Sequence, residues 1–127
     1  MCFPQFSDMG PVAASHGFAR TSMWRVAGQT DDSVTMELPA DDEQRARLRE
    51  VWPHDFVLSL TTTLQRGDTL MQTMEVANVG SEPFAFTTCL HTYLRVDTAA
   101  VSVAGLSGLP FMDNTAARAV CAPHPDG

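Results

Sequence analysis

The sequence predicts an all-β protein, an antiparallel β-sandwich with one short helix. Three observations favour this fold class: several short segments alternate apolar and polar residues, turn residues separate them, and threonine and aromatic residues are concentrated within them. The chain has 127 residues, which is the size of one ordinary domain and is enough to bury a core. We therefore expect a single domain over residues 1–127.

The first part of the chain predicts a loop followed by a β-hairpin. Prolines and glycines interrupt residues 1–20, which is typical of an ordered loop rather than a helix or strand. Residues 22–29 and 33–38 then alternate apolar and polar side chains around a short acidic turn. This pattern indicates two antiparallel strands.

Residues 41–52 predict a short α-helix. Asp41 and Asp42 lie at its start, where the positive end of the helix dipole favours acidic side chains, and arginines follow toward its other end. Pro53 has no backbone N–H to continue the helical hydrogen bonds, so we expect the helix to stop before it.

Further strands are expected along the rest of the chain. Residues 55–65 and 68–79 alternate, and the second segment should be half-buried, with one polar interruption on each face. Residues 83–96 predict an aromatic and threonine-rich strand with a polar row opposite an apolar face, and residues 99–106 predict a further short strand. Residues 114–127 break the alternation, so we expect a divergent, loosely ordered terminus there.

The acidic charge balance excludes two kinds of partner. Eight basic residues, all arginine, stand against 15 Asp plus Glu, and the formal net charge is -7. A nucleic acid or an anionic membrane would need a basic patch, so neither is an expected partner. No apolar run approaches the ~20 residues of a transmembrane helix, and no secretory signal is expected. We expect a cytoplasmic protein, with an organellar one as the alternative.

The cysteines and the motif content give no sign of a metal or cofactor. Cys2, Cys89 and Cys121 are odd in number and widely spaced, which predicts reduced thiols rather than a disulfide framework or a zinc site. The sequence has no HExxH, GxSxG, phosphate-loop or GxGxxG motif. We therefore expect no metal and no cofactor.

Two histidines and one arginine are the residues best suited to chemistry. His91 belongs to the polar row of its strand, and His16 lies with Arg20 in the stretch SHGFAR. Each histidine could instead be a structural residue with hydrogen-bond partners. Arg20 could form an ordinary surface salt bridge rather than bind a phosphate or carboxylate through two hydrogen bonds. His54 and His124 lie in loops and are expected at the surface.

Five blocks follow one another along residues 2–113: CFPQF, HGFARTSMW, WPHDFVLSLTTTL, MEVANVGSEPFAFTTCLHTYLRV and VSVAGLSGLPFMD. In this order they resemble the aldose 1-epimerase superfamily, and within it the glucose-6-phosphate 1-epimerases, also called hexose-6-phosphate mutarotases. The HGFAR signature alone would be weak, whereas five blocks in the right order are specific.

The resemblance implies a galactose-mutarotase-like β-sandwich and a cofactor-independent isomerase that interconverts the α and β anomers of a hexose 6-phosphate. In this mechanism an acid protonates the ring oxygen and a carboxylate base deprotonates the anomeric hydroxyl, so the ring opens, rotates and recloses. By match, His91 is the catalytic acid, a role that suits histidine. His16 matches a sugar-contacting histidine, Arg20 matches an arginine that binds the 6-phosphate, and Ser15 replaces a substrate-binding glutamine. The expected partner is this small-molecule substrate, and the chain is expected to be a monomer.

The resemblance also implies residues that this sequence does not contain. A second phosphate-binding arginine, a substrate-binding aspartate and the glutamate base have no counterpart in it. Because β-sandwich enzymes run to about 200–250 residues, we expect an incomplete domain, about half of the family domain, with impaired epimerase activity. The alternatives are a non-catalytic fragment that binds a phosphosugar and a fragment that does not fold alone.

Overall fold

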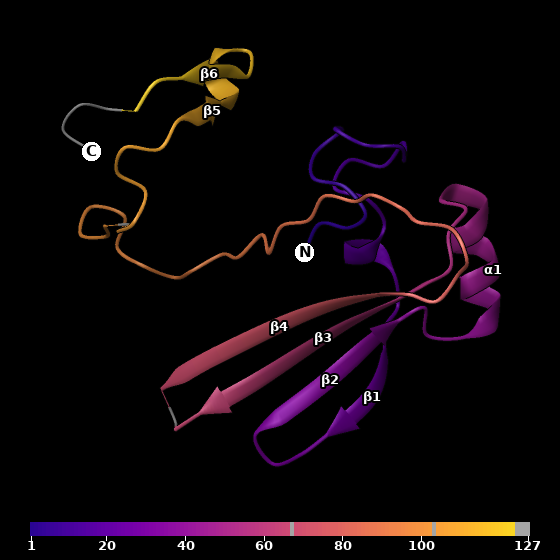
Figure 1. Cartoon of the computed structure of the whole chain (residues 1–127). Helices are drawn as coiled ribbons and strands as arrows, with labels where there is room; N and C mark the ends of the chain where they lie inside the picture. The colour runs from indigo at the N-terminus through magenta and orange to yellow at the C-terminus, as the bar shows by residue number, and fades with distance from the viewer. Residues whose placement is uncertain (67, 103, 124–127) are drawn as a thin grey trace. The chain divides into compact units, whose positions relative to one another are not determined.

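The computed structural model describes residues 1–66, 68–102 and 104–123. The chain divides into two compact units, Met1–Thr92 and Tyr93–Gly127. Among the described residues, the first unit contains a four-stranded antiparallel sheet and the one α-helix, and the second unit contains a two-stranded antiparallel hairpin (Figure 1). The predicted all-β, antiparallel fold class is therefore confirmed.

Four strands form the antiparallel sheet of the first unit: β1 (Arg25–Gln29), β2 (Ser33–Leu38), β3 (Phe56–Gln65) and β4 (Thr69–Asn78). They lie in the order β1-β2-β3-β4, so each strand pairs with its neighbour in sequence (Figure 1). Across the sheet, Leu38 of β2 lies opposite Leu58 of β3, and Leu58 in turn lies opposite Val76 of β4. The predicted hairpin and the two longer strands are confirmed.

The helix α1 (Asp42–Val51) connects β2 to β3 at one end of the sheet (Figure 1). The Asp41 carboxylate caps it by accepting the N–H of Gln44 at 2.7 Å, and the Gln44 side chain accepts the N–H of Ala40 at 2.7 Å. The cap satisfies one of the N–H groups that a first helical turn leaves without partners. The predicted helix is confirmed. Within the described ranges, no helix is long and apolar enough to cross a membrane.

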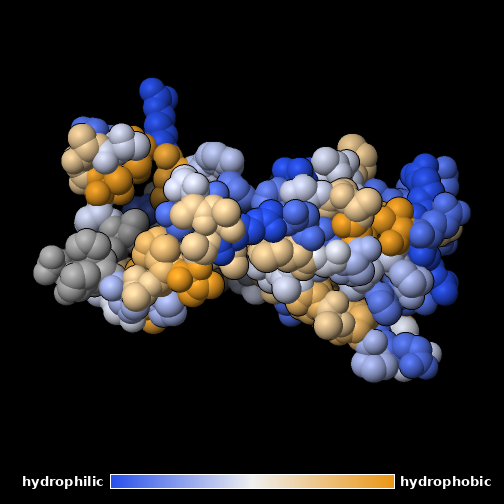
Figure 2. All heavy atoms as spheres, turned by 90° about the horizontal axis from the view of Figure 1, so that it is seen from above, coloured by the Kyte–Doolittle hydropathy of each residue, from blue (hydrophilic) through white to orange (hydrophobic). Residues whose placement is uncertain are grey.

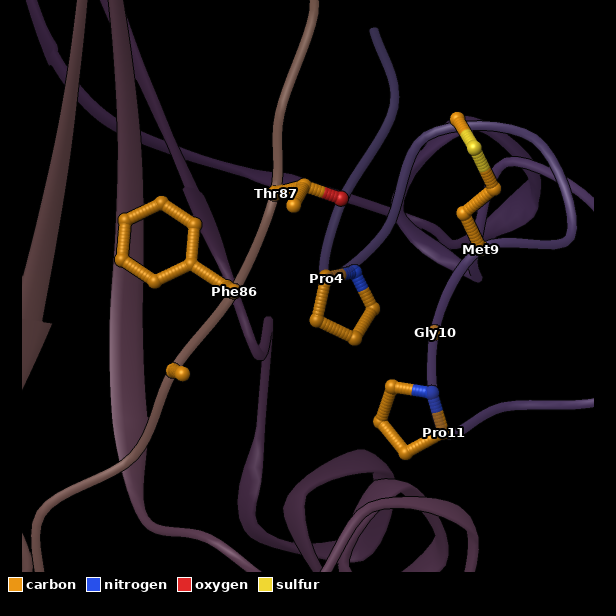
Figure 3. Close-up of a pocket in the computed structure, with 7 residues that line it drawn as sticks. Pro4, Met9, Gly10, Pro11, Phe86 and Thr87 are labelled. Carbon is orange, nitrogen blue, oxygen red and sulfur yellow. The ribbon is translucent and has the colours of Figure 1, made fainter.

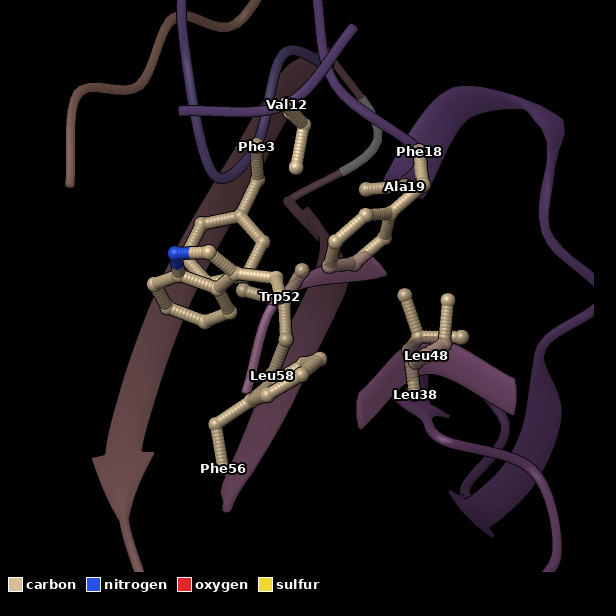
Figure 4. Close-up of a cluster of buried hydrophobic side chains, with 9 residues drawn as sticks. All are labelled: Phe3, Val12, Phe18, Ala19, Leu38, Leu48, Trp52, Phe56 and Leu58. Carbon is tan, nitrogen blue, oxygen red and sulfur yellow. The ribbon is translucent and has the colours of Figure 1, made fainter. Parts of the chain in front are cut away.

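The core of the first unit lies at this same end of the sheet, between the strands, α1 and the N-terminal loop (Figure 4). Phe3 is central to it, because its ring contacts those of Phe18, Trp52 and Phe56 at centroid distances of 6.1, 5.5 and 5.3 Å. Full burial of such a side chain stabilises a fold by about 1.5–3 kcal/mol. Phe3 therefore holds the N-terminal loop against the sheet.

The prediction of a sheet strand at residues 83–96 is wrong. Among the described residues, this segment belongs to no strand and makes one isolated antiparallel bridge, between Cys89 and Cys2. At the next position of this pairing, the N–H of Thr87 donates to the carbonyl oxygen of Pro4 at 3.0 Å. The reciprocal bond cannot form because proline has no N–H. Pro4 thus stops a ladder that the local sequence of the segment favours.

The outer part of the sheet exposes apolar side chains. In β4, Met74 and Val76 are partly buried against the core, whereas Leu70 is 59% and Met71 43% exposed. Figure 2 shows hydrophobic residues at the surface, between polar ones. The predicted half-burial of this strand is therefore seen at Met74 and Val76, in its second half, and is absent from its first half.

The second unit contains a short hairpin, β5 (Phe111–Asp113) and β6 (Ala119–Cys121), joined through the 3-10 turn η2 (Asn114–Ala116). The Asp113 carboxylate accepts the N–H of Thr115 at 2.8 Å and its hydroxyl at 2.6 Å, which holds the pKa of Asp113 below its ordinary range. The expected irregular terminus is therefore wrong up to residue 121. His124 lies outside the described residues, and the described part of 99–106 contains no strand.

Candidate functional site

His16 and Gly17 form a tight bend that leads into the 3-10 turn η1 (Ala19–Thr21). Their φ angles are positive, 66° for His16 and 69° for Gly17. A positive φ is uncommon for a residue other than glycine and persists where the surroundings hold it. Here the N–H of His16 donates to the carbonyl of Ser7 at 2.7 Å, and its carbonyl accepts the N–H of Phe3 at 3.2 Å. The backbone thus fixes the direction of the histidine side chain.

The N-terminal segment joins this bend to the segment that carries His91. On one side, Phe3 forms a parallel bridge with Gly17 and accepts the N–H of Phe18 at 3.1 Å. On the other side, Cys2 pairs antiparallel with Cys89. Because residues 2 and 3 lie between the two segments, residues far apart in the sequence are brought to one place in the fold.

A buried amide organises the loop behind His16. Gln5 is 1% exposed, and its Nε2 donates to the carbonyl oxygens of Val12 at 2.9 Å, Ser7 at 3.2 Å and Ala14 at 3.3 Å. Its Oε1 accepts the N–H of Val12 at 2.8 Å. Buried polar groups stabilise a fold when they are fully paired. The hydrogen bonds of the Gln5 amide hold together a loop that contains no helix or strand.

The ring of His16 has a defined tautomer. Nδ1 lies 3.1 Å from the backbone N of Ser7 and 3.2 Å from Sγ of Cys2. A backbone N–H can only donate, so Nδ1 must be the accepting nitrogen and the ring proton lies on Nε2. His16 therefore presents an N–H donor on the side of the ring away from Ser7.

The rings of His16 and His91 meet edge to face. Their centroids are 5.7 Å apart and their planes cross at 85°. His91 is exposed and lines a hollow of about 220 Å³ whose other walls include Leu60 of β3, Gln72 of β4 and Thr92. We call His16 and His91 the histidine pair. His91 thus lies in the wall of a space that a small polar molecule can enter, and His16 lies against the ring of His91.

Arg20 and Ser15 lie on the exposed surface of the same bend. Nη2 of Arg20 donates to the carbonyl oxygen of Ser15 at 3.1 Å, and within the described ranges the guanidinium forms no salt bridge with a carboxylate. The turn beneath it is anchored by Trp24, whose Nε1–H donates to the carbonyl of Ala19 at 2.9 Å. The surface salt bridge that was the alternative for Arg20 is absent there. An arginine with further N–H groups can bind an anion.

Comparison with known families decides the membership of the chain. The sequence profile of the aldose 1-epimerase family matches residues 1–121. The chain belongs to the aldose 1-epimerase family. Its all-β, antiparallel architecture is consistent with the sandwich-like fold of this family, and membership points to sugar epimerase or mutarotase chemistry. No solved structure matches the chain.

Three residues beside His16 were not recognised as site components from the sequence: Gln5, Ser7 and Cys2. Gln5 and Ser7 position His16 through a buried amide and a backbone N–H, and both sit in a loop that was recognised only as ordered. The block CFPQF, which contains Gln5, was the available signal. Cys2 adds a thiol whose pKa is raised, chiefly by burial.

His54 and a second hollow lie away from the histidine pair. His54 was expected at the surface, but its ring packs on Trp52 at 4.6 Å and on Phe84 at 5.2 Å, so it is a half-buried packing residue. A second hollow of about 190 Å³ lies between the N-terminal loop and Phe86 (Figure 3); it is lined largely by proline, methionine and phenylalanine side chains and contains none of the candidate residues. No group of three metal-ligating side chains occurs in the part of the chain that the structure describes.

Proposed function

We propose that this aldose 1-epimerase acts on a hexose 6-phosphate and interconverts its α and β anomers. The observation that carries the proposal is the histidine pair, with ring centroids 5.7 Å apart, together with the Arg20 guanidinium, which lies on the same bend as His16. A proton donor for the ring oxygen serves the opening of any aldose ring, whereas a cation that can bind the phosphate favours a phosphorylated sugar over an unphosphorylated one.

His91 is the proposed general acid. It is exposed, and Gln72 and Thr92 in the same hollow can bind sugar hydroxyls. Protonation of the ring oxygen by His91 lets the bond from that oxygen to the anomeric carbon break. A positioned acid of this kind contributes about 10²–10⁴ in rate.

His16, Ser15 and Arg20 are the proposed substrate-binding residues. Nε2–H of His16 can donate to a sugar oxygen, because Nδ1 is already occupied by Ser7 and Cys2. The hydroxyl of Ser15 comes from the adjacent position and replaces a longer glutamine in the family pattern. Arg20 keeps further N–H groups beyond the one bound to Ser15, which suits two parallel hydrogen bonds to a phosphate.

No residue of the sequence matches the glutamate that acts as general base in the family mechanism. Without a counterpart of the family glutamate, we propose that the chain by itself catalyses slowly. This favours a second function, the binding of a phosphosugar without turnover, because Ser15, His16 and Arg20 are held by the backbone bonds of one bend and do not depend on a base.

Anomerisation of glucose 6-phosphate, measured against buffer, tests the proposed reaction. We expect a small acceleration that His91→Ala abolishes. His91→Gln should be equally inactive, because glutamine can form a hydrogen bond but cannot act as a general acid. A rate unaffected by either substitution would remove His91 as the acid. Turnover comparable to that of a complete aldose 1-epimerase would contradict the slow-catalysis proposal.

Calorimetric titration tests binding separately. We expect glucose 6-phosphate to bind more tightly than glucose, and this preference should be lost in Arg20→Ala and kept in Arg47→Ala. Arg47 is the matched control because it is an exposed arginine on α1 that pairs with Glu43. No heat with either sugar would contradict both functions.

A further inference from the structure

Two free thiols face each other in the isolated bridge of the first unit. The N–H of Cys2 donates to the carbonyl of Cys89 at 2.8 Å, and the N–H of Cys89 donates back to the carbonyl of Cys2 at 3.4 Å. Antiparallel residues that exchange both bonds have Cα atoms about 5.5 Å apart, and their side chains lie on the same side of the pair. The paired backbone therefore places the two cysteine side chains next to each other on one side.

The backbone spacing suits a disulfide. Disulfide-linked residues have Cα atoms about 4.4–6.8 Å apart, and their Cβ atoms lie about 3.5–4.5 Å apart, against about 4.5–5.5 Å for a cross-strand pair. Because a hydrogen-bonded pair lies at the wider end of the cross-strand range, closure needs a shift of about 1–2 Å. Cys89 lies outside any sheet ladder because Pro4 ends the pairing beside it. The shift can occur without breaking a strand pair.

The two thiols differ in their surroundings. Cys89 is half-buried, whereas Cys2 is 1% exposed, so an oxidant in solution reaches Cys89 first. Burial also raises the pKa of the Cys2 thiol, which lowers its reactivity toward an oxidant in solution. Nδ1 of His16, 3.2 Å from Sγ, holds this sulfur in place. Cys2 is thus placed to react with an oxidised Cys89 rather than with the oxidant itself.

We propose that Cys2 and Cys89 form a reversible disulfide site that is oxidised by hydroperoxides. The Cys89 sulfur attacks the O–O bond of hydrogen peroxide, which gives a sulfenic acid and one water. The Cys2 sulfur then attacks the Cys89 sulfur; the S–S bond forms, the S–O bond breaks, and the hydroxyl leaves with the Cys2 proton as a second water. The thiols lose two electrons and the peroxide gains them. A small dithiol then reduces the protein disulfide to the two thiols by thiol–disulfide exchange and is itself oxidised to a disulfide.

The disulfide would act on the histidine pair, and this step rests on the proposed function. Cys89 lies two positions before His91, and Cys2 touches His16. The bond would tie together the two segments that carry the histidines and restrict the His91 segment before a sugar binds. From the ordering cost of one side chain, we expect glucose 6-phosphate to bind about two- to tenfold more tightly to the oxidised chain.

The linkage is tested on the whole chain with hydrogen peroxide alone. After treatment and alkylation of the remaining thiols, mass spectrometry of proteolytic peptides should find one cross-link, between Cys2 and Cys89, with the loss of two hydrogen atoms. Cys121 should be alkylated, and dithiothreitol should restore three thiols. Conversion of Cys89 to a sulfinic acid while Cys2 stays a thiol, or cross-links that involve Cys121 equally, would overturn the proposal.

Three variants sharpen this test without requiring any sugar. Cys121→Ser is the matched control and should form the same cross-link. Cys2→Ser and Cys89→Ser should form none, and in Cys2→Ser, which lacks the second thiol, Cys89 should proceed to the sulfinic acid. If Cys2→Ser fails to fold, Cys89→Ser decides: a peroxide-induced disulfide in this variant would contradict the assigned pair.

The effect on the site is measured separately, by titration of reduced and oxidised chain with glucose 6-phosphate. The expected gain in affinity should vanish in Cys89→Ser. Equal affinities of the reduced and the cross-linked chain would overturn the coupling and leave the mapped disulfide standing. Absence of binding in both states counts against the proposed function and against the coupling, whereas the peptide map alone decides the disulfide.

Discussion

The α-carbon of Gly17 lies against the carbonyl oxygen of Phe3, and there is no room between them for a side chain. A Cβ at position 17 would collide with this oxygen and come within 2.8 Å of Cδ of Pro4. The same two residues form the parallel bridge that sets His16 beside the N-terminal segment. Glycine is therefore needed both for its positive φ and for the close approach of two backbones.

Gly17→Ala should destabilise the first unit and separate the histidine pair. The left-handed conformation costs an alanine about 1–2 kcal/mol, and displacement of the Phe3 backbone adds to it, so we expect the free energy of unfolding to fall by about 2 kcal/mol or more. Urea unfolding measures this. Gly28→Ala is the control, because a Cβ there meets nothing within 4 Å; a similar loss in both variants would show that the Phe3 contact is not the cause.

Gln5→Ala should loosen the loop that supports His16. It would leave the N–H of Val12 and up to three carbonyl oxygens without their partner, at a cost of about 1–3 kcal/mol for a buried unsatisfied group. We expect the loss in urea unfolding together with faster amide exchange at residues 12–16. Gln65→Ala, which removes an exposed amide at the end of β3, should change the stability by less than about 0.5 kcal/mol. Protected amides in Gln5→Ala would contradict this role.

The elements predicted correctly from the sequence are those whose signals are local. β2, β3 and α1 follow from alternation, from the acidic start of the helix and from Pro53, all within each segment. The segment 83–92 has the same local signal, but its partner carries Pro4, many positions away. Only the paired backbones show that the ladder must stop.

The residues of the candidate site likewise fall into those that the sequence indicated and those that it did not. The resemblance to the family indicated His16, Arg20 and His91, and the structure brings the two histidine rings into contact. The roles of these residues stay predictions. The role of Gln5 in holding the loop behind His16 could not be predicted from the sequence. Gln5 is one of several polar residues in this loop, and it acts through hydrogen bonds to residues seven and nine positions away. The pairing of Cys2 with Cys89 likewise could not be predicted from the sequence, because it depends on how the two backbones pair.

Asp41→Ala should weaken α1 and the packing of Trp52, which directly follows the helix. The Asp41 carboxylate accepts the N–H of Gln44 at 2.7 Å, and removal of such a cap costs about 1 kcal/mol. Thermal or urea unfolding of the whole chain measures the loss. Glu50→Ala, at an exposed position near the end of the same helix, removes a negative charge but no cap and should cause no loss. Equal destabilisation by both would argue against the cap.

The Cys2 thiol should make the reduced chain less stable in alkali. Burial raises the pKa of Cys2 above its ordinary value of 9.0 in the folded chain. Below that value the thiol is protonated in both states. As the pH rises from there toward the raised pKa, the unfolded chain loses this proton first, so the free energy of unfolding falls by at most about 1.4 kcal/mol per pH unit.

Urea unfolding between pH 7 and 10, with a reductant that prevents the disulfide, measures this slope. Cys2→Ser should lose that part of the alkaline slope, because serine does not titrate in this range, whereas Cys121→Ser should keep it. Alkylation of Cys2 by iodoacetamide should likewise require a higher pH than alkylation of a cysteine in a short peptide, since the thiolate is the reactive form. Identical slopes in the parent chain and in Cys2→Ser would show that the Cys2 thiol ionises equally easily in the folded and unfolded chains.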